Sequence, residues 1–246
     1  MIQLTLIQID NYGPWTTTPE PKREADLQIL QSSIYRDIQQ QFSSKKALAF
    51  WTRGDNMFAA TNGLSLEDHR RIIDSLNRRY PVTVSMAIAA AKTPIEAQKK
   101  ASEALSEAGS AKNAGRVGVL KEAGLTKDKV QIAHFDINNI TERTDTDVYD
   151  SYREVTETLL ELVRQLEKKN AMVFFMAGDN YISVCNGLAK KDIEDVLQIV
   201  EEKAGVKLKA GVGLADSAEE ATQLASMGLK EIRSGKAREH VVFKQG

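Results

Sequence analysis

Four aspartates occupy positions at which the chain could build paired carboxylate sites. Asp10 ends an alternating apolar segment and Asp55 lies in the turn Arg53-Gly54-Asp55-Asn56, while Asp136 and Asp179 have similar surroundings later in the chain. Two carboxylates at one sheet edge repel unless a cation neutralises them, and Mg²⁺ takes such oxygens together with water and phosphate. The pattern therefore indicates magnesium-dependent chemistry; the alternative is that Gly-Asp-Asn is only favourable turn chemistry.

A zinc mechanism does not suit this composition. Zinc sites use clustered cysteine and histidine ligands, whereas Cys185 is the only cysteine and the three histidines, His69, His134 and His240, show no ligand spacing. The single cysteine also excludes a disulfide framework. Any metal at the aspartates is expected to be Mg²⁺, with no zinc.

The chain repeats itself. At an offset of 124 residues, segment 47–105 lies over 171–229 without a gap, so that Gly-Asp-Asn meets Gly-Asp-Asn and Asn62-Gly63-Leu64 meets Asn186-Gly187-Leu188. The first strands also align, at an offset of 126, which places Asp10 over Asp136. We interpret the chain as two copies of one unit.

The hydrophobic period of each unit predicts the order β-α-β-β-α-β-α. In the first unit the expected elements are a strand at 2–9, a loop at 10–21, a helix at 22–43, a hairpin of 47–51 and 57–61, a helix at 65–79, a strand at 82–90 and a helix from 93. In the second they are a strand at 130–135, a helix at about 145–168, a hairpin at 171–185, a helix at 190–203, a strand at 206–214 and a helix at 217–233.

This order predicts an α+β protein of two tandem ferredoxin-like (βαββαβ) units with extra helices, each a four-stranded antiparallel sheet covered on one face. Its domains are expected at 1–110 and 129–246, joined by a linker at 111–128. A short segment at 241–243 has no counterpart that we can place. The first and third strands of each sheet are neighbours, which brings Asp10 near Asp55 and Asp136 near Asp179.

Composition limits the partners. The 33 basic and 34 acidic residues give a net charge of -1, which removes the argument for a nucleic-acid or anionic-membrane partner. The sequence contains no apolar run of the ~20 residues that span a bilayer, and its first residues alternate like a strand rather than a signal peptide. We expect a soluble, cytoplasmic protein.

Several strings resemble archaeal GTP cyclohydrolase III, a family with the palm fold of nucleotidyl cyclases and polymerases. They are Ile7-Gln8-Ile9-Asp10-Asn11-Tyr12-Gly13-Pro14-Trp15, Arg53-Gly54-Asp55-Asn56, Asn62-Gly63, Phe135-Asp136-Ile137-Asn138-Asn139-Ile140-Thr141 and Gly178-Asp179-Asn180. The resemblance covers residues 1 to about 235. It implies opening of the imidazole ring of GTP with the formyl group retained, giving 2-amino-5-formylamino-6-(5-phosphoribosylamino)pyrimidin-4(3H)-one and inorganic phosphate.

The resemblance also implies two or more Mg²⁺ ions, activation by K⁺, a homo-oligomer and a product used for flavin or deazaflavin synthesis. The expected metal ligands are Asp10, Asp55, Asp136 and Asp179. We expect the Asp10/Asp55 pair to hold the catalytic metal and the second unit to contribute to GTP recognition. The expected substrate-binding residues are Asn11, Tyr12, Trp15, Asn56, Asn138, Asn139, Asn180 and Lys209.

Four of the candidates have two readings each. His134 shares strand parity with Asp136 and could act as a base or be structural. Tyr12 and Trp15 could stack on the purine or anchor their loop, and Lys209 could reach a phosphate or protect a strand edge. Separately, Gly211 and Gly213 do not match a dinucleotide fingerprint and are expected to allow close helix packing.

Two other functions share the expected fold. A purine nucleotidyl cyclase would use the same metal pair but would release pyrophosphate without opening the ring; a diguanylate cyclase would carry a second acid after its Gly-Gly-Asp, where this chain has Asn. A non-catalytic nucleotide-binding regulatory protein is the third reading, although degenerate palm domains usually lose their metal acids.

Overall fold

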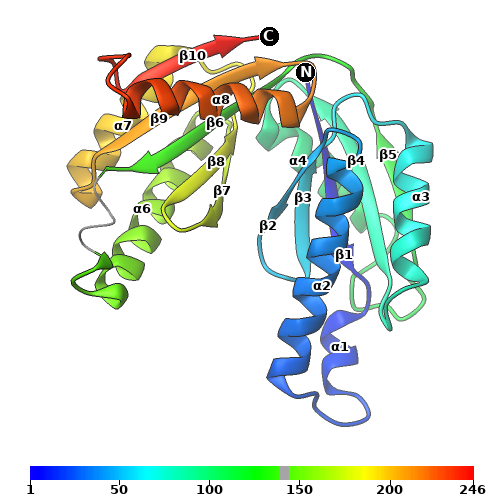
Figure 1. Cartoon of the computed structure of the whole chain (residues 1–246). Coiled ribbons are helices and arrows are strands. Elements are labelled where there is room, and N and C mark those ends of the chain that lie inside the picture. The colour runs from blue at the N-terminus through cyan, green and yellow to red at the C-terminus, as the bar shows by residue number, and fades with distance from the viewer. Residues whose placement is uncertain (139–143) are drawn as a thin grey trace. The chain divides into compact units, whose positions relative to one another are not determined.

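The chain folds into two units of the same α+β architecture (Figure 1). The computed structural model describes residues 1–138 and 144–246. One unit comprises 1–91 with 96–128, and the other comprises 129–246 with 92–95. The expected α+β class with two tandem units is confirmed. Within the described residues, no helix is both long and apolar enough to cross a membrane.

The first unit contains a five-stranded sheet in the order β2-β3-β1-β4-β5. β1 lies antiparallel between β3 and β4, and β5 is parallel to β4. The strands are β1 Ile2–Ile9, β2 Leu48–Trp51, β3 Asn56–Ala60, β4 Val84–Ala91 and β5 Leu120–Ala123. The helices are α1 Tyr12–Thr17, α2 Glu24–Ser43, α3 Leu66–Asn77 and α4 Pro94–Ser106.

The second unit repeats this plan in the order β10-β9-β6-β8-β7. β6 lies antiparallel between β8 and β9, and β10 is parallel to β9. The strands are β6 Val130–Ile137, β7 Met172–Ala177, β8 Asn180–Val184, β9 Leu208–Ala215 and β10 Val241–Gln245. The helices are α6 Val148–Lys168, α7 Lys190–Ala204 and α8 Ala218–Arg233.

Each sheet has a fifth strand that the sequence pattern does not indicate. β5 lies within the expected linker 111–128, and β10 lies in the segment expected to have no counterpart. Met86 pairs with Leu120 and Ala210 pairs with Val241; since Met86 and Ala210 are 124 residues apart, β5 and β10 are equivalent. Both are short, partly exposed edge strands with charged residues, which show little hydrophobic alternation. Likewise, the expected loop 10–21 contains α1.

Helices cover both faces of each sheet, and not one face as expected. On β1, Ile7 and Ile9 pack against α2 and α3, whereas Leu6 packs against Ala101 and Leu105 of α4. Gln8 and Asp10 share the parity of Leu6. In the second unit α8 packs on β9 and β6 (Figure 1), so the even-numbered side chains of β6 face α8.

The hydrogen bonds of β1 and β6 correct the alignment of the two units. Gln3 N donates to Asn62 Oδ1 at 2.8 Å, and Gln131 N donates to Asn186 Oδ1 at 3.1 Å. Asn62 and Asn186 differ by 124, but Gln3 and Gln131 differ by 131 − 3 = 128. The first strands are therefore equivalent at an offset of 128, and not 126.

The hydrogen bonds at the C-terminal ends of β1 and β6 give the same offset of 128. Asp10 N donates to Thr83 O at 2.8 Å, and Asn138 N donates to Lys207 O at 3.0 Å. Thr83 and Lys207 again differ by 124 in number, whereas Asp10 and Asn138 differ by 128.

Asp10 is consequently the counterpart of Asn138, and Asp136 is the counterpart of Gln8. The expected equivalence of Asp10 and Asp136 is wrong. A shift of two residues leaves every side chain on its original face of the strand, so hydrophobic alternation cannot distinguish the two alignments.

Candidate active site

Asp10 is a buried, fully bonded carboxylate in the first unit, 3% exposed. Its Oδ1 accepts from Arg116 Nε at 2.9 Å, and its Oδ2 accepts from the hydroxyls of Thr83 and Ser85, both at 2.9 Å, and from Gly118 N at 3.1 Å. The Arg116 side chain is only 2% exposed. The charge of Asp10 is thus neutralised within the protein by a buried arginine.

Arg116 makes two further hydrogen bonds, and Asp55 has a separate cationic partner. Arg116 also donates to Gln8 Oε1 at 2.7 Å and to Gly109 O at 3.2 Å, and Gln8 Nε2 donates to Asn56 Oδ1 at 2.7 Å. Asp55 lies in the β2–β3 hairpin with Arg53 Nη2 at 3.5 Å from its Oδ2. Asp10 and Asp55 therefore each have an arginine partner.

The second unit brings two carboxylates into electrostatic contact. Asp136, 3% exposed, accepts from Lys209 Nζ, 2.6 Å from its Oδ2, and from Arg233 through its Oδ1. Burial, and secondly the negative charge of Asp136, raise the pKa of Asp179 in the β7–β8 hairpin. Lys209 Nζ also donates to Asn138 Oδ1 at 3.0 Å. The result is a mixed centre of two acids and two cations.

His134 belongs to a hydrogen-bonded row that ends at Asp179. Asn180 Nδ2 donates to Asp179 Oδ1 at 3.1 Å, which leaves Asn180 Oδ1 to accept from His134 Nε2 at 2.9 Å. His134 Nδ1 then accepts from Ser226 Oγ at 3.2 Å. Burial lowers the pKa of His134, so the neutral ring is favoured. Both ring nitrogens already have partners, which suits an orienting role.

An apolar cavity of about 400 Å³ adjoins Asp179. Tyr152 and Val155 of α6 line it, and Phe175 of β7 lies at the hairpin side. Tyr152 is 63% and Phe175 40% exposed, which is unusual for large rings. The Tyr152 ring contacts Tyr149 and the Phe175 ring contacts Tyr181. The cavity therefore offers two partly exposed aromatic rings beside Asp179.

The aromatic residues expected to bind substrate in the first unit are engaged with each other. The rings of Tyr12 and Trp15 stack with centroids 6.1 Å apart, and Lys22 Nζ lies 4.3 Å from the Trp15 ring centre. Both rings pack against the core of the first unit. Asn11 begins α1 in the left-handed region with φ 51°. Asn139 lies outside the described residues.

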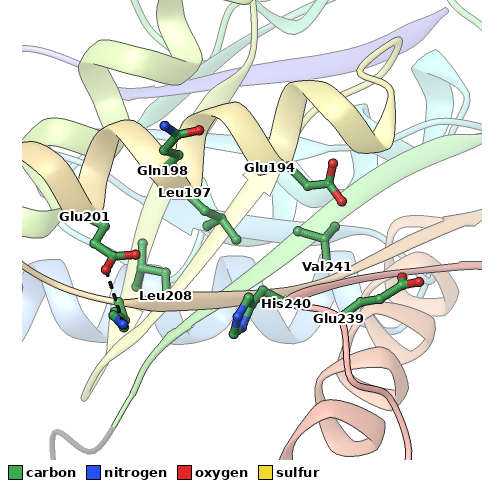
Figure 2. Close-up of a pocket in the computed structure, with 9 residues that line it drawn as sticks. Glu194, Leu197, Gln198, Glu201, Leu208, Glu239, His240 and Val241 are labelled. Carbon is green, nitrogen blue, oxygen red and sulfur yellow. Dashed lines mark ion pairs between the residues drawn. The ribbon is translucent and has the colours of Figure 1, made fainter.

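A second cavity of about 400 Å³ in the same unit lies between α7 and the strands β9 and β10, where Leu197, Leu208 and Val241 line it (Figure 2). Leu208 and Val241 belong to the core beneath α6 and α7. Lys209, the next residue on β9, lies on the opposite face of the sheet, where it contacts Asp136. Glu201 at its rim forms an ion pair with Lys207 at 3.4 Å. This cavity is separate from the acid centre.

Sequence patterns did not reveal four of these residues. Arg116 lies in the segment expected to be a linker, and Arg233 lies in the last turn of α8, where basic residues are common. Tyr152 and Phe175 follow the normal periodicity of their helix and strand, and only their exposure marks them. None of the four belongs to a local motif.

Fold and site together define an α+β protein of two tandem units, with an acid–cation centre built in one of them. The family model for GTP cyclohydrolase III matches residues 1–246. A GTP cyclohydrolase III from Methanococcus vannielii is 52% identical over 241 residues, covering 96% of this chain and 90% of the relative. One from Methanothermobacter thermautotrophicus is 51% identical over 239 residues, covering 96% of both. The chain belongs to the GTP cyclohydrolase III family and is an enzyme.

Solved structures give weaker matches. A bacterial light-regulated adenylyl cyclase has a TM-score of 0.40 at 10% identity, covering 99% of this chain and 85% of that one. The GGDEF domain of DgcB from Caulobacter crescentus has a TM-score of 0.39 at 14% identity, covering 47% of this chain and 77% of that one.

Proposed function

We propose that this enzyme opens the imidazole ring of GTP by hydrolysis, and that the reaction takes place at the Asp136–Asp179 centre of the second unit. Family membership supports the activity. The observation that supports the location is that the two carboxylates lie close enough to interact, so that the charge of Asp136 adds to the effect of burial in raising the pKa of Asp179. In the first unit Asp10 is instead held by the buried Arg116.

The donor set suits Mg²⁺. Asp136 and Asp179 would hold it, with the amide oxygens of Asn138 and Asn180 nearby as further hard ligands. When bound, the metal would supply Lewis acidity and a water of lowered pKa. K⁺ as an activator and a homo-oligomeric state are part of the same proposal, carried over from the family resemblance.

Lys209 and Arg233 would bind phosphate oxygens of the nucleotide. Both contact Asp136, and Arg233, at 51% exposed, can turn toward a ligand without leaving a buried charge. Arginine binds phosphate oxygens in a bidentate fashion and lysine binds them as a point charge. The reaction also hydrolyses the phosphoanhydride bonds of GTP, and this step requires neutralisation of the negative charge on the phosphates.

The cavity beside Asp179 would receive the base. Tyr152 and Phe175 present ring faces on which a purine can stack. Asn180 and His134 would position Asp179 through their hydrogen bonds. Addition of water at C8 and cleavage of the C8–N9 bond would leave the formyl group on N7. The product would be the formylamino-pyrimidine ribonucleotide monophosphate, a precursor for flavin or deazaflavin synthesis.

The test combines product analysis with a matched pair of variants. GTP and Mg²⁺ are incubated with the protein, and the product is analysed by ultraviolet spectroscopy and mass. A retained formyl carbon with one remaining phosphate is expected, whereas a cyclic nucleotide with an intact ring would establish a cyclase instead.

Asp179→Asn and Asp55→Asn change the same hairpin position in the two units. Asp179→Asn is expected to lower turnover about a hundredfold or more, the loss that follows removal of one group acting directly on a reacting centre. Asp55→Asn should retain most activity, because the ion-pair partner that Asp55 loses, Arg53, is exposed and can turn to solvent. If Asp55→Asn loses the activity and Asp179→Asn keeps it, the working centre lies in the first unit.

A further inference from the structure

The first unit contains a cavity of about 570 Å³ on the face of its sheet that carries α4. Leu6 and Gln8 of β1 and Phe58 of β3 form its floor, and Ser102 and Leu105 of α4 form a wall. Its volume lies within the usual range of small-ligand sites. None of the functions proposed above uses this cavity.

The cavity exists because α4 lies farther from its sheet than α8 does. In the second unit a Cβ at Gly211 would come within 1.8 Å of Ala225 O, and one at Gly213 within 2.0 Å of Ala221 O, so α8 rests directly on β9. The expectation that these glycines permit close helix packing is confirmed. The first unit has Ala87 at the position of Gly211.

Ala87 and, at the position of Gly213, Ala89 are buried beneath α4. Ala101 of α4 is the counterpart of Ala225, the residue whose carbonyl a Cβ at Gly211 would meet. The methyl groups of Ala87 and Ala89 therefore keep α4 farther from β4 and leave space between helix and sheet.

The corresponding space of the second unit is crossed by side chains. His134 occupies the strand position of Leu6 and bonds to Ser226, the counterpart of Ser102. Arg233 occupies the position of Gly109, which lines the first-unit cavity, and extends to Asp136. The first unit therefore keeps open a volume that the second unit fills with parts of its proposed catalytic centre.

The lining of the cavity suits a planar, anionic ligand. Among the described residues that line it there is no acid, but there are two arginines. Arg116 is fixed by Asp10, whereas the Arg53 side chain is 79% exposed with Asp55 at 3.5 Å, and can contact a phosphate at the mouth. Phe58, Leu6 and Leu105 provide apolar surface, and the hydroxyl of Ser102 can bond to a base edge.

We propose that the first unit binds a purine nucleotide in this cavity and does not transform it. The base would lie between the sheet floor and α4, with its phosphates at Arg53. Arg116 also lines the cavity, but its charge is balanced by Asp10, so we assign the phosphates to Arg53. This inference rests on the proposed function only in assigning turnover to the second unit.

The test is the number of GTP molecules bound per chain, measured by equilibrium dialysis with radiolabelled GTP in the full-length Asp179→Asn background, which slows the consumption of GTP. Ser102→Phe places a phenyl group in the cavity and should lower the bound GTP by one equivalent per chain. Glu103→Phe puts the same group on the exposed side of α4 and should leave the number unchanged. An equal number for both variants would overturn the proposal.

Arg53→Ala keeps the result interpretable if Ser102→Phe does not fold, because Arg53 is an exposed hairpin residue. It should weaken binding of one GTP equivalent about tenfold, the loss expected for one charged hydrogen bond. Product formation by Ser102→Phe in the otherwise wild-type chain separates the two proposals. If that variant loses turnover together with binding, the cavity is the substrate site. If the wild-type chain forms no ring-opened product yet the cavity still binds GTP, only the proposed function fails.

Discussion

The two units share their sheet but place their buried acids differently. In the first unit Asp10 at the end of β1 is paired with Arg116, which is 2% exposed. In the second the acid lies two residues earlier in the strand, at Asp136, and one of its two cations, Arg233, is 51% exposed. A buried arginine that binds three other protein groups is a structural element. An exposed arginine can exchange its partner for a ligand. The comparison therefore distinguishes Asp10, which is held by a buried arginine, from Asp136, the acid that we propose to act in the reaction.

Removing the arginine from each acid should give the largest contrast. Arg116→Met leaves Asp10 buried without its cation, and the first unit should lose about 3–5 kcal/mol of stability. Arg233→Met leaves Asp136 with Lys209 and should cost about 1 kcal/mol or less, because Arg233 is half-exposed. The measurement is guanidinium unfolding, followed by tryptophan fluorescence and by circular dichroism.

Both tryptophans, Trp15 and Trp51, lie in the first unit, so their fluorescence reports that unit. The double variant Asp10→Leu/Arg116→Met serves as the control and should recover part of the loss, since it removes both charges. Equal losses for Arg116→Met and Arg233→Met would contradict the distinction between the two acids.

The helix–sheet contact gives the next largest effect. Gly211→Ala forces a methyl group into the carbonyl of Ala225, which can be relieved only by moving α8. A cost of about 1–3 kcal/mol is expected in the second unit. The reverse change in the first unit, Ala87→Gly, adds backbone freedom and removes a buried methyl group, and should cost about 1 kcal/mol.

Two probes distinguish these variants. Gly211→Ala should shift the circular dichroism transition while the tryptophan transition of the first unit stays in place, and Ala87→Gly should shift the tryptophan transition. An unchanged circular dichroism transition for Gly211→Ala would show that α8 does not rest on β9 as closely as described.

The fold was largely predictable from the sequence because its signals are local. Alternation and helical periodicity identified the four antiparallel strands and the long helices of each unit, and Ser65 with Asp68 forms the capping box that their spacing indicates. The fifth strands were missed because β5 and β10 are short edge strands stabilised by parallel pairing with a distant strand. Such pairing leaves no pattern within the segment itself.

The site was less predictable because it depends on register. The four aspartates were identified as candidates, but an offset of 126 instead of 128 made Asp10 and Asp136 appear equivalent. The register is shown by hydrogen bonds such as the one that Gln131 N donates to the side-chain oxygen of Asn186, a residue 55 positions away. Arg116 reaches Asp10 across 106 positions, so no local spacing could reveal the pair.

One buried polar pair of the first unit has an apolar counterpart in the second. His69 Nδ1 donates to Ser65 O at 2.7 Å, and its Nε2 accepts from Thr5 Oγ1 at 2.8 Å. The second unit has Ala133 and Ile193 at the positions of Thr5 and His69, and both are fully buried.

Burial lowers the pKa of His69, with Asp68 opposing and Lys45 reinforcing the shift to a smaller extent. The native state therefore keeps the ring neutral while the unfolded chain takes up a proton near its ordinary pKa of about 6.5. The contribution of His69 to stability is complete above that pH and is lost as the pH falls below it.

The smallest expected effect, and the most specific, comes from giving the first unit the apolar pair of the second. Thr5→Ala/His69→Ile removes the donor and acceptor of the Thr5–His69 bond together, and Thr61 Oγ1, which also contacts Thr5, keeps its bond from Gln3 Nε2. The stability of the double variant near about pH 7.5 should therefore stay within about 1 kcal/mol of wild type. Thr5→Ala alone leaves His69 Nε2 without a partner and should cost more. Tryptophan-monitored unfolding at about pH 7.5 and about pH 5.5 should show a smaller loss on acidification for the double variant, because the groups that titrate elsewhere are the same in both proteins. If the double variant loses as much stability on acidification as wild type, another group carries the pH dependence of the first unit.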